Sequence, residues 1–213
     1  MQLLAIGPGA GGKNCKISAT GFFVNEDGYL VTNAHVVDDA RRCLAMSPEA
    51  KILAKLASPA GRAAPAVSCD VVGVDEVHDI AVLKTERRPA QVLGTEIAPF
   101  ALLDSEEMQP GAPVVLTGHP TFAWQPVTQR GWVLRRGSLR LTESSSESTE
   151  VLAVNIAPQV GNSGSPVYLP TGEVVAIVER KDPADASNTI AVPIRHAVDL
   201  LNRLGVTWHA ARR

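Results

Sequence analysis

Residues 19–33 read "ATGFFVNEDGYLVTN", and this stretch predicts a β-hairpin. Two apolar, β-prone runs flank the polar turn "NEDG" (25–28), as expected of two antiparallel strands joined by a turn. Residues 67–85 repeat the pattern, and further β-type runs follow at 112–118, 125–136, 150–156, 165–169, 173–180 and 189–194. Short strands at this spacing predict an all-β protein, either a sandwich or barrels.

The chain divides into two β halves. Residues 86–111 lack a clean period and carry three prolines, so they read as a connection between the halves. Only the end of the chain has apolar residues at helical spacing: Ile194, Val198, Leu201 and Leu204. We therefore expect one domain over 1–213, with a first β half at about 15–90, a linker at 91–111, a second β half at 112–194 and a helix at 194–204. The polar stretches 47–66 and 142–150 are expected to form surface loops.

The composition excludes several classes of protein. With 213 residues, 45% of them hydrophobic, and a formal charge of −2, the chain has no basic footprint for nucleic acid or an acidic membrane surface. No apolar run approaches the roughly 18 residues needed to cross a bilayer, and the first residues lack the basic start of an export signal. We therefore expect a cytoplasmic protein. Cys15, Cys43 and Cys69 are odd in number and widely spaced, so we expect small buried hydrophobes rather than a disulfide framework or a zinc site.

The stretch "PQVGNSGSPVYLP" (158–170) places Ser163 between glycines at 161 and 164. Glycine lets the backbone enter left-handed geometry without a side-chain clash, so the turn exposes the serine. The same residue types also make ordinary surface turns, and short Gly/Ser motifs are unspecific on their own. The stretch therefore predicts either a surface turn or a nucleophile whose neighbouring N–H groups point at one place.

Two other polar residues lie at the ends of predicted strands. His35 follows the first hairpin in "LVTNAHVVDDA" (30–40), and Asp79 precedes an apolar strand in "EVHDIAVLK" (76–84). A serine nucleophile needs an imidazole that accepts its proton and a carboxylate that orients this imidazole. Each residue alone is more often a packing, capping or turn residue. Together, in the order His35, Asp79, Ser163, they favour nucleophilic catalysis.

Four segments carry a family resemblance: "TGFFVNEDGYLVTNAHVV", "VVGVDEVHDIAVLK", "PFALLDSEEMQPGAPVVLTGHP" and "APQVGNSGSPVYLPTGEVVAIV". Together they resemble the protease domain of the HtrA (Deg) branch of the trypsin-like serine proteases, in family order from about Ala19 to Leu204. The resemblance implies two six-stranded antiparallel β-barrels, a C-terminal helix and an active site in the crevice between the barrels. It also implies a catalytic triad of His35 as general base, Asp79 as its orienting group and Ser163 as nucleophile.

Further site residues follow only from this resemblance. The backbone N–H groups of Gly161 and Ser163 would form the oxyanion hole. Ala157 would lie at the base of the pocket for the side chain before the scissile bond. The strand segment formed by Glu179, Arg180 and Lys181 would line the entrance of that pocket and pair with the substrate backbone.

The sequence also departs from the family pattern. No PDZ domain follows within the 213 residues, although HtrA-type proteins usually carry one. Ser165 replaces the commonest glycine of the motif, a variant that resembles the staphylococcal glutamyl endopeptidases. Asn162 precedes the nucleophile where secreted trypsins have aspartate, and no "IVGG" start is present, so activation by clipping of the N-terminus is not expected.

Three functions remain open. An active serine endopeptidase is favoured because all the parts are present; the alternatives are a binding module of the same fold without catalysis and an unrelated β-protein with a chance turn. For an enzyme, the small Ala157 favours cleavage after Val, Ala, Ile or Leu over cleavage after Arg or Lys. Arg180 and Lys181 would instead favour glutamate, although exposed cations contribute little. The aliphatic preference is the leading prediction.

The expected partners are protein or peptide substrates, with a possible regulatory domain or partner outside this chain. No cofactor is expected. The spacing of the remaining histidines gives no support to a metal site: His78, His119, His196 and His209.

Overall fold

The computed structural model describes residues 1–8, 14–44, 51–56, 65–103, 108–121, 123, 125–142 and 146–211. Its strands are β1 (Gln2–Pro8), β2 (Asn14–Thr20), β3 (Phe22–Phe23), β4 (Tyr29–Thr32), β5 (Ile52–Lys55), β6 (Ala66–Asp75), β7 (Ile80–Thr85), β8 (Pro113–Gly118), β9 (Val127–Leu139), β10 (Thr149–Val154), β11 (Pro166–Tyr168), β12 (Val174–Lys181) and β13 (Thr189–Pro193). Its helices are α1 (Ala34–Leu44), α2 (Pro89–Leu93) and α3 (Arg195–Arg203). Within these ranges, no helix has the length and apolar character needed to span a membrane.

The first β half is a barrel whose closure depends on one bent strand. Its strand order is β2-β1-β5-β6-β7-β4-β3, with antiparallel pairing throughout. Because β2 ends at Thr20 and β3 begins at Phe22, the two are halves of one strand that bends at Gly21. The first half pairs with β1 and the second with β4, so this strand brings the two edges of the sheet together. Counted in this way, the barrel has the six strands that the resemblance implies.

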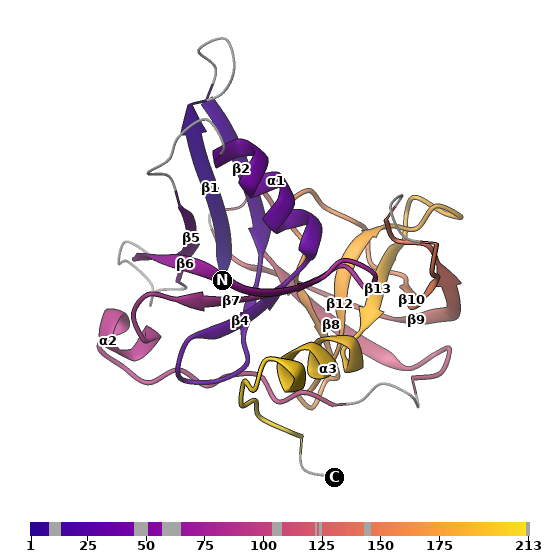
Figure 1. Cartoon of the computed structure of the whole chain (residues 1–213). Coiled ribbons are helices and arrows are strands. Elements are labelled where there is room, and N and C mark those ends of the chain that lie inside the picture. Colours follow the sequence, from indigo (N-terminus) through magenta and orange to yellow (C-terminus); the bar gives the residue numbers. More distant parts are fainter. Residues whose placement is uncertain are drawn as a thin grey trace.

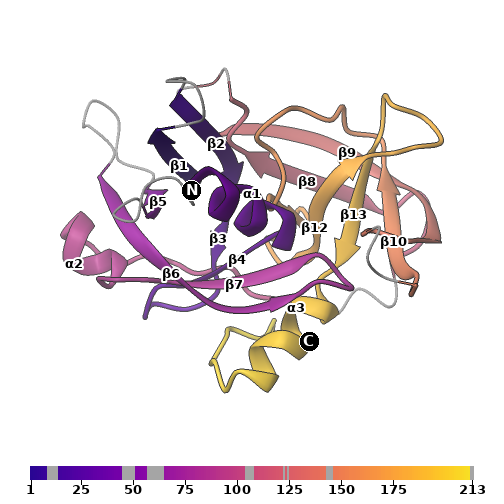
Figure 2. The same cartoon turned by 45° about the horizontal axis from the view of Figure 1, so that its top comes forward.

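The second β half is a closed antiparallel barrel with the order β10-β13-β12-β11-β8-β9. The two barrels lie side by side, and α3 lies along their common edge (Figures 1 and 2). The prediction of an all-β protein with two six-stranded barrels and a C-terminal helix is therefore confirmed.

The two barrels share one apolar core at their seam. This cluster contains Phe22 and Ile80 from the first barrel, Ile177 and Ile190 from the second, and Leu201 from α3, all almost completely buried. Each barrel also has its own interior cluster. Burial of such aliphatic side chains is the main favourable contribution to folding. The seam cluster therefore joins the folding of α3 to the docking of the barrels.

Several elements were not expected from the sequence. Residues 34–44 form α1, whereas only the end of the chain was expected to be helical. The buried positions of this helix are Ala34, Val36, Val37, Ala40 and Cys43. The spacing of these apolar residues is helical, but the strand pattern that precedes the helix and the two aspartates within it mask the helical signal in the sequence. The short strand β5 lies within the expected loop 47–66. It pairs with β1 and β6, and its residues are alternately buried and partly exposed. Residues 47–50 and 57–64 of that loop, and 143–145 of the loop 142–150, lie outside the described residues.

The structure tests the expectation for two of the three cysteines, Cys43 and Cys69. Cys69 is a free, buried thiol whose pKa burial raises to about 12, as expected of a small hydrophobe. Cys43, at the end of α1, takes part in a disulfide. The expectation of small buried hydrophobes at all three positions is therefore wrong for Cys43, because sequence spacing does not reveal which thiols tertiary folding brings together.

Replacing Leu201 tests the shared core. Leu201 is fully buried in α3, so Leu201→Ala should leave a cavity and lower the free energy of unfolding by about 2–5 kcal/mol. Asp199→Ala, on the exposed face of the same helix, should change it by no more than about 0.5 kcal/mol. Urea denaturation measures both. Equal effects of the two substitutions would contradict a structural role for the seam.

Candidate active site

The loop between β10 and β11 presents Ser163. Gly161 has φ = 100° and Gly164 has φ = 79°, both in the left-handed region that favours glycine. A Cβ atom would lie 2.5 Å from the carbonyl oxygen of His119 at position 161 and 2.2 Å from that of Thr20 at position 164. Both glycines are therefore required by backbone conformation and by close packing, and the turn holds the half-buried Ser163 between them.

His35 is placed by the N-terminus of α1, of which it is the second residue. The first N–H groups of a helix have no partner within the helix. The backbone N–H of His35 donates to Oδ1 of Asp79 (2.8 Å), and its ring Nδ1 donates to Oδ2 of the same carboxylate (2.7 Å). Asp79 thus caps the helix and orients the imidazole with the same side chain.

Asp79 itself has an unusual backbone conformation, because its φ of 55° is left-handed in a residue other than glycine. Its carbonyl oxygen accepts hydrogen bonds from the backbone N–H of Ala34 (3.1 Å) and from Nδ2 of Asn33 (3.1 Å). Four hydrogen bonds therefore join Asp79 to the end of β4 and the start of α1. These contacts hold a side chain that is only 2% exposed.

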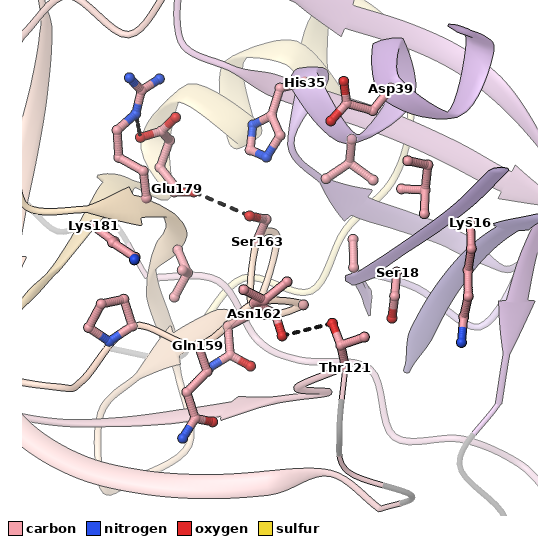
Figure 3. Close-up of a pocket in the computed structure, with 18 residues that line it drawn as sticks. Lys16, Ser18, His35, Asp39, Thr121, Gln159, Asn162, Ser163, Glu179 and Lys181 are labelled. Carbon is pink, nitrogen blue, oxygen red and sulfur yellow. Dashed lines mark hydrogen bonds and ion pairs between the residues drawn. The ribbon is translucent and has the colours of Figure 1, made fainter. Parts of the chain in front are cut away.

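The surroundings of His35 favour its protonated form. Burial of the imidazole lowers its pKa. The hydrogen bond and the charge of Asp79 raise this pKa, as do the charges of Glu179 and Asp39. The net pKa of His35 lies above the ordinary value. The ring is 38% exposed and is directed toward Ser163 (Figure 3). The site can therefore accept a proton at His35 and stabilise the resulting imidazolium.

Ser163 lies opposite His35 in a cleft of about 640 Å³ lined by residues of both barrels. Its hydroxyl donates to the backbone oxygen of Glu179 on β12, at 3.3 Å (Figure 3). The structure thus brings His35 and Asp79 from the first barrel together with Ser163 from the second. Such an arrangement provides a nucleophile, a proton acceptor and an orienting carboxylate.

The backbone amides of Gly161 and Ser163 are the expected oxyanion donors. Within the described residues, neither N–H has a hydrogen-bond acceptor in the protein. The carbonyl oxygens of the same two residues are engaged: Oγ1 of Thr20 donates to Gly161 (2.8 Å), and N–H of Thr20 donates to Ser163 (2.9 Å). Two unpaired N–H groups beside a nucleophile are suited to stabilising an oxyanion.

Of the residues expected to bind substrate, some line the cleft and one does not. Ala157 is exposed and does not line the cleft, whose wall here is formed by Pro158, Gln159 and Val160. Glu179, Arg180 and Lys181 all line the cleft. The side chain of Glu179 is buried and forms an ion pair with Arg180, whereas Lys181 extends into the cleft (Figure 3).

Three residues have donor atoms that could hold a metal ion, with one atom each from His35, Asp79 and Glu179 within 4.8 Å of one another. Each of these residues already has a partner inside the protein. The Asp79 carboxylate accepts the hydrogen bond from Nδ1 of His35, and Glu179 is paired with Arg180. The cluster is therefore organised around a proton and a cationic side chain.

Thr20 is a site residue that sequence reasoning missed. In addition to its contacts with Gly161 and Ser163, its Oγ1 accepts a hydrogen bond from N–H of His119 (2.9 Å), and its carbonyl accepts one from Oγ1 of Thr32 (2.8 Å). It is only 1% exposed. These partners lie 12 to 143 positions away along the chain, so no local pattern could have revealed this role.

Comparison with known proteins gives the family. The family model described as "Trypsin-like peptidase domain" matches residues 19–177. The chain belongs to the trypsin-like peptidase family. This trypsin-like peptidase is similar to proteins described as probable periplasmic serine endoprotease DegP-like, in agreement with the predicted HtrA branch.

These relatives are longer than the present chain. The Pseudomonas putida (strain GB-1) relative is 30% identical over 189 residues, which cover 87% of this trypsin-like peptidase and 34% of the relative. For the Hahella chejuensis relative the identity is 29% over 206 residues, covering 95% and 38%. The chain therefore spans somewhat more than a third of the length of these curated relatives.

A solved structure supports the fold. The Rv3671c protease from M. tuberculosis, in its active form, superposes with a TM-score of 0.69 at 20% sequence identity. The match covers 99% of this trypsin-like peptidase and 82% of the solved chain. At this identity the likeness bears on the fold alone.

Substitution of Thr20 tests how the loop is held. Thr20→Val removes the hydroxyl and leaves the carbonyl of Gly161 and the N–H of His119 without this partner. The rate of labelling of Ser163 by a fluorophosphonate probe should fall by about tenfold or more, toward the loss seen when an oxyanion donor is removed. Thr20→Ser keeps the hydroxyl and should retain most of the rate. Equal losses in the two variants would contradict this role, because keeping the hydroxyl would then not preserve the rate.

Proposed function

We propose that this chain is an active serine endopeptidase domain that cleaves peptide bonds through an acyl-enzyme. The observation that carries the proposal is the pair of hydrogen bonds from His35 to Asp79, with Ser163 opposite the imidazole in a cleft lined by both barrels. A binding module without catalysis would need none of this arrangement. Proteins of this fold that have lost catalysis commonly show a replaced triad residue, and none of the three residues is replaced here.

In the first step, Oγ of Ser163 attacks the carbonyl carbon of the scissile bond while its proton passes to Nε2 of His35. Asp79 keeps the Nδ1–H tautomer in place and stabilises the imidazolium that forms. The negative charge on the carbonyl oxygen is stabilised by the N–H groups of Gly161 and Ser163. Because the resting hydroxyl donates to the backbone oxygen of Glu179, it rotates toward His35 before attack.

In the second step, the imidazolium of His35 donates its proton to the leaving amine, and the C–N bond breaks to give an ester at Ser163. A water molecule then attacks this ester with His35 again as the base. The resulting acid leaves, and the proton returns to Oγ of Ser163. No group outside the protein, the peptide and water is needed to balance these steps.

The triad is tested by substitution of its members one at a time. Ser163→Ala and His35→Ala should each remove nearly all peptidase activity on unfolded protein, and the double variant should be little worse than either. Asp79→Asn should cost several orders of magnitude because it favours the wrong tautomer of His35. Mass spectrometry should locate a fluorophosphonate adduct on Ser163 in the parent chain. Activity above about a tenth of the parent in Ser163→Ala would overturn the assignment.

For substrate selection we infer a preference for small or medium aliphatic residues before the scissile bond. Beside the nucleophile loop, the cleft is lined by Pro158, Val160 and Val178, which offer apolar contacts to such a side chain. The charge of Arg180 is already paired with Glu179, which weakens its attraction for a substrate carboxylate. Lys181 supports the second candidate, a preference for glutamate, because its amino group extends into the cleft (Figure 3).

Digestion of a complex peptide mixture distinguishes these preferences. The aliphatic proposal expects Val, Ala, Ile or Leu before most cuts, and Lys181→Ala should leave this pattern unchanged. Dominant cleavage after Glu that is lost in Lys181→Ala would replace the aliphatic preference with the second candidate. Dominant cleavage after Arg or Lys would contradict both, since the cleft has no unpaired buried carboxylate among the described residues.

A further inference from the structure

The proposed reaction does not use the side chain of Glu179, although this carboxyl group is one of the most deeply buried in the site. Its side chain is 1% exposed. On β12 the pairing with β13 passes from Val178 opposite Ala191 to Arg180 opposite Ile190, so Glu179 is the extra residue of a β-bulge. Bulges change the direction of a side chain relative to a regular strand and are common beside active sites. This one directs a carboxyl group into the protein.

Glu179 has the triad on one side. One of its carboxyl oxygens lies within 4.8 Å of a ring nitrogen of His35 and of a carboxyl oxygen of Asp79. Burial raises the pKa of Glu179, the ion pair with Arg180 lowers it, and the charge of Asp79 raises it further, with a net pKa above the ordinary value. An ionised carboxylate here is therefore costly without a cationic partner.

Arg180 is that partner. Its Nε donates to the Glu179 carboxylate, and its second nitrogen donates to the backbone oxygen of Leu141. The Glu179 carboxylate therefore contacts the Arg180 cation and also lies close to the imidazole of His35. It can interact with a positive charge on both groups whenever His35 is protonated.

We propose, building on the triad assignment above, that Glu179 and Arg180 are positioning residues for catalysis. The Glu179 carboxylate stabilises the imidazolium of His35, and Arg180 keeps this carboxylate ionised. A buried charge is screened much less by solvent and salt than an exposed one, so it acts on the imidazole at this distance.

The other charged groups that face His35 have separate roles. Asp79 contacts Nδ1 directly and determines the tautomer. Asp39, one turn along α1, also favours the protonated ring, but it is exposed and screened. Glu179 is thus the second buried carboxylate beside the imidazole. A reaction whose transition state carries an imidazolium benefits from both.

The rate of fluorophosphonate labelling of Ser163 as a function of pH tests this proposal, because it requires no knowledge of the natural substrate. Labelling requires neutral His35, so its rate should rise with pH through the pKa of His35 and then reach a plateau. Because that pKa is raised, the midpoint in the parent chain should lie above about 6.5.

Glu179→Gln keeps the shape of the side chain and removes its charge. The midpoint should move to lower pH by about one unit, and the plateau rate should fall severalfold because the base is weaker. Glu173→Gln makes the same change of charge six residues earlier, in the turn before β12, and should leave the midpoint in place. A role of Glu179 in stability alone would lower the melting temperature without moving the midpoint, and this result would overturn the proposal.

The double variant Glu179→Gln/Arg180→Gln examines the pair. In the single variant the Arg180 cation has lost its carboxylate partner and its charge opposes protonation of His35, so its removal should return part of the shift. The double variant should therefore have a midpoint between those of Glu179→Gln and the parent. The double variant buries no unpaired charge, so its midpoint can still be compared with that of the parent chain if Glu179→Gln alone does not fold. A midpoint equal to that of the parent would overturn the role of Glu179, and one equal to that of the single variant would overturn that of Arg180. Failure of the parent chain to label at Ser163 would instead refute the triad itself.

Discussion

The geometry of this site depends on the two hydrogen bonds between the Asp79 carboxylate and His35. The two carboxylate oxygens accept hydrogen bonds from the backbone N–H and the ring Nδ1–H of His35, so one side chain both caps the N-terminus of α1 and fixes the orientation of the imidazole. This requires Asp79 to take a left-handed backbone conformation, which costs free energy. The hydrogen bonds that its carbonyl accepts from Asn33 and Ala34 offset that cost. Strain at this position is therefore balanced by contacts that also join β7 to the end of β4.

The second half of the site depends on docking between the barrels. Thr20 belongs to the first barrel, yet it binds the carbonyl oxygens of Gly161 and Ser163 in the second. These carbonyls share their peptide planes with the N–H groups of Asn162 and Gly164, so Thr20 fixes the backbone on both sides of Ser163. The seam cluster and α3 stabilise this docking by apolar burial. Catalytic geometry and barrel packing are thus parts of the same interface.

The electrostatics of the site follow from the placement of two carboxylates around one imidazole. Asp79 supplies direct contact, and Glu179 supplies a second charge that Arg180 balances. A buried carboxylate without such a partner would take up a proton rather than remain charged. Fixed charges arranged in advance cost no reorganisation when the imidazolium forms, and this is how a protein interior can favour a transition state over the ground state.

The sequence by itself determined the class of fold and pointed to the three residues of the proposed triad. Alternating apolar runs with turn residues predict antiparallel strands, and the motifs around His35, Asp79 and Ser163 are local enough to read. The sequence did not reveal α1, whose buried stripe follows directly on a strand, or β5, which is stable only between its two neighbours. Nor could it indicate that Thr20 holds the oxyanion loop or that Glu179 lies beside the imidazole. Those roles depend on contacts between residues far apart in the chain, and a bulge of one residue decides which way Glu179 points. Hydrogen bonding and burial at the barrel interface arise only after folding, so only the tertiary structure could decide them.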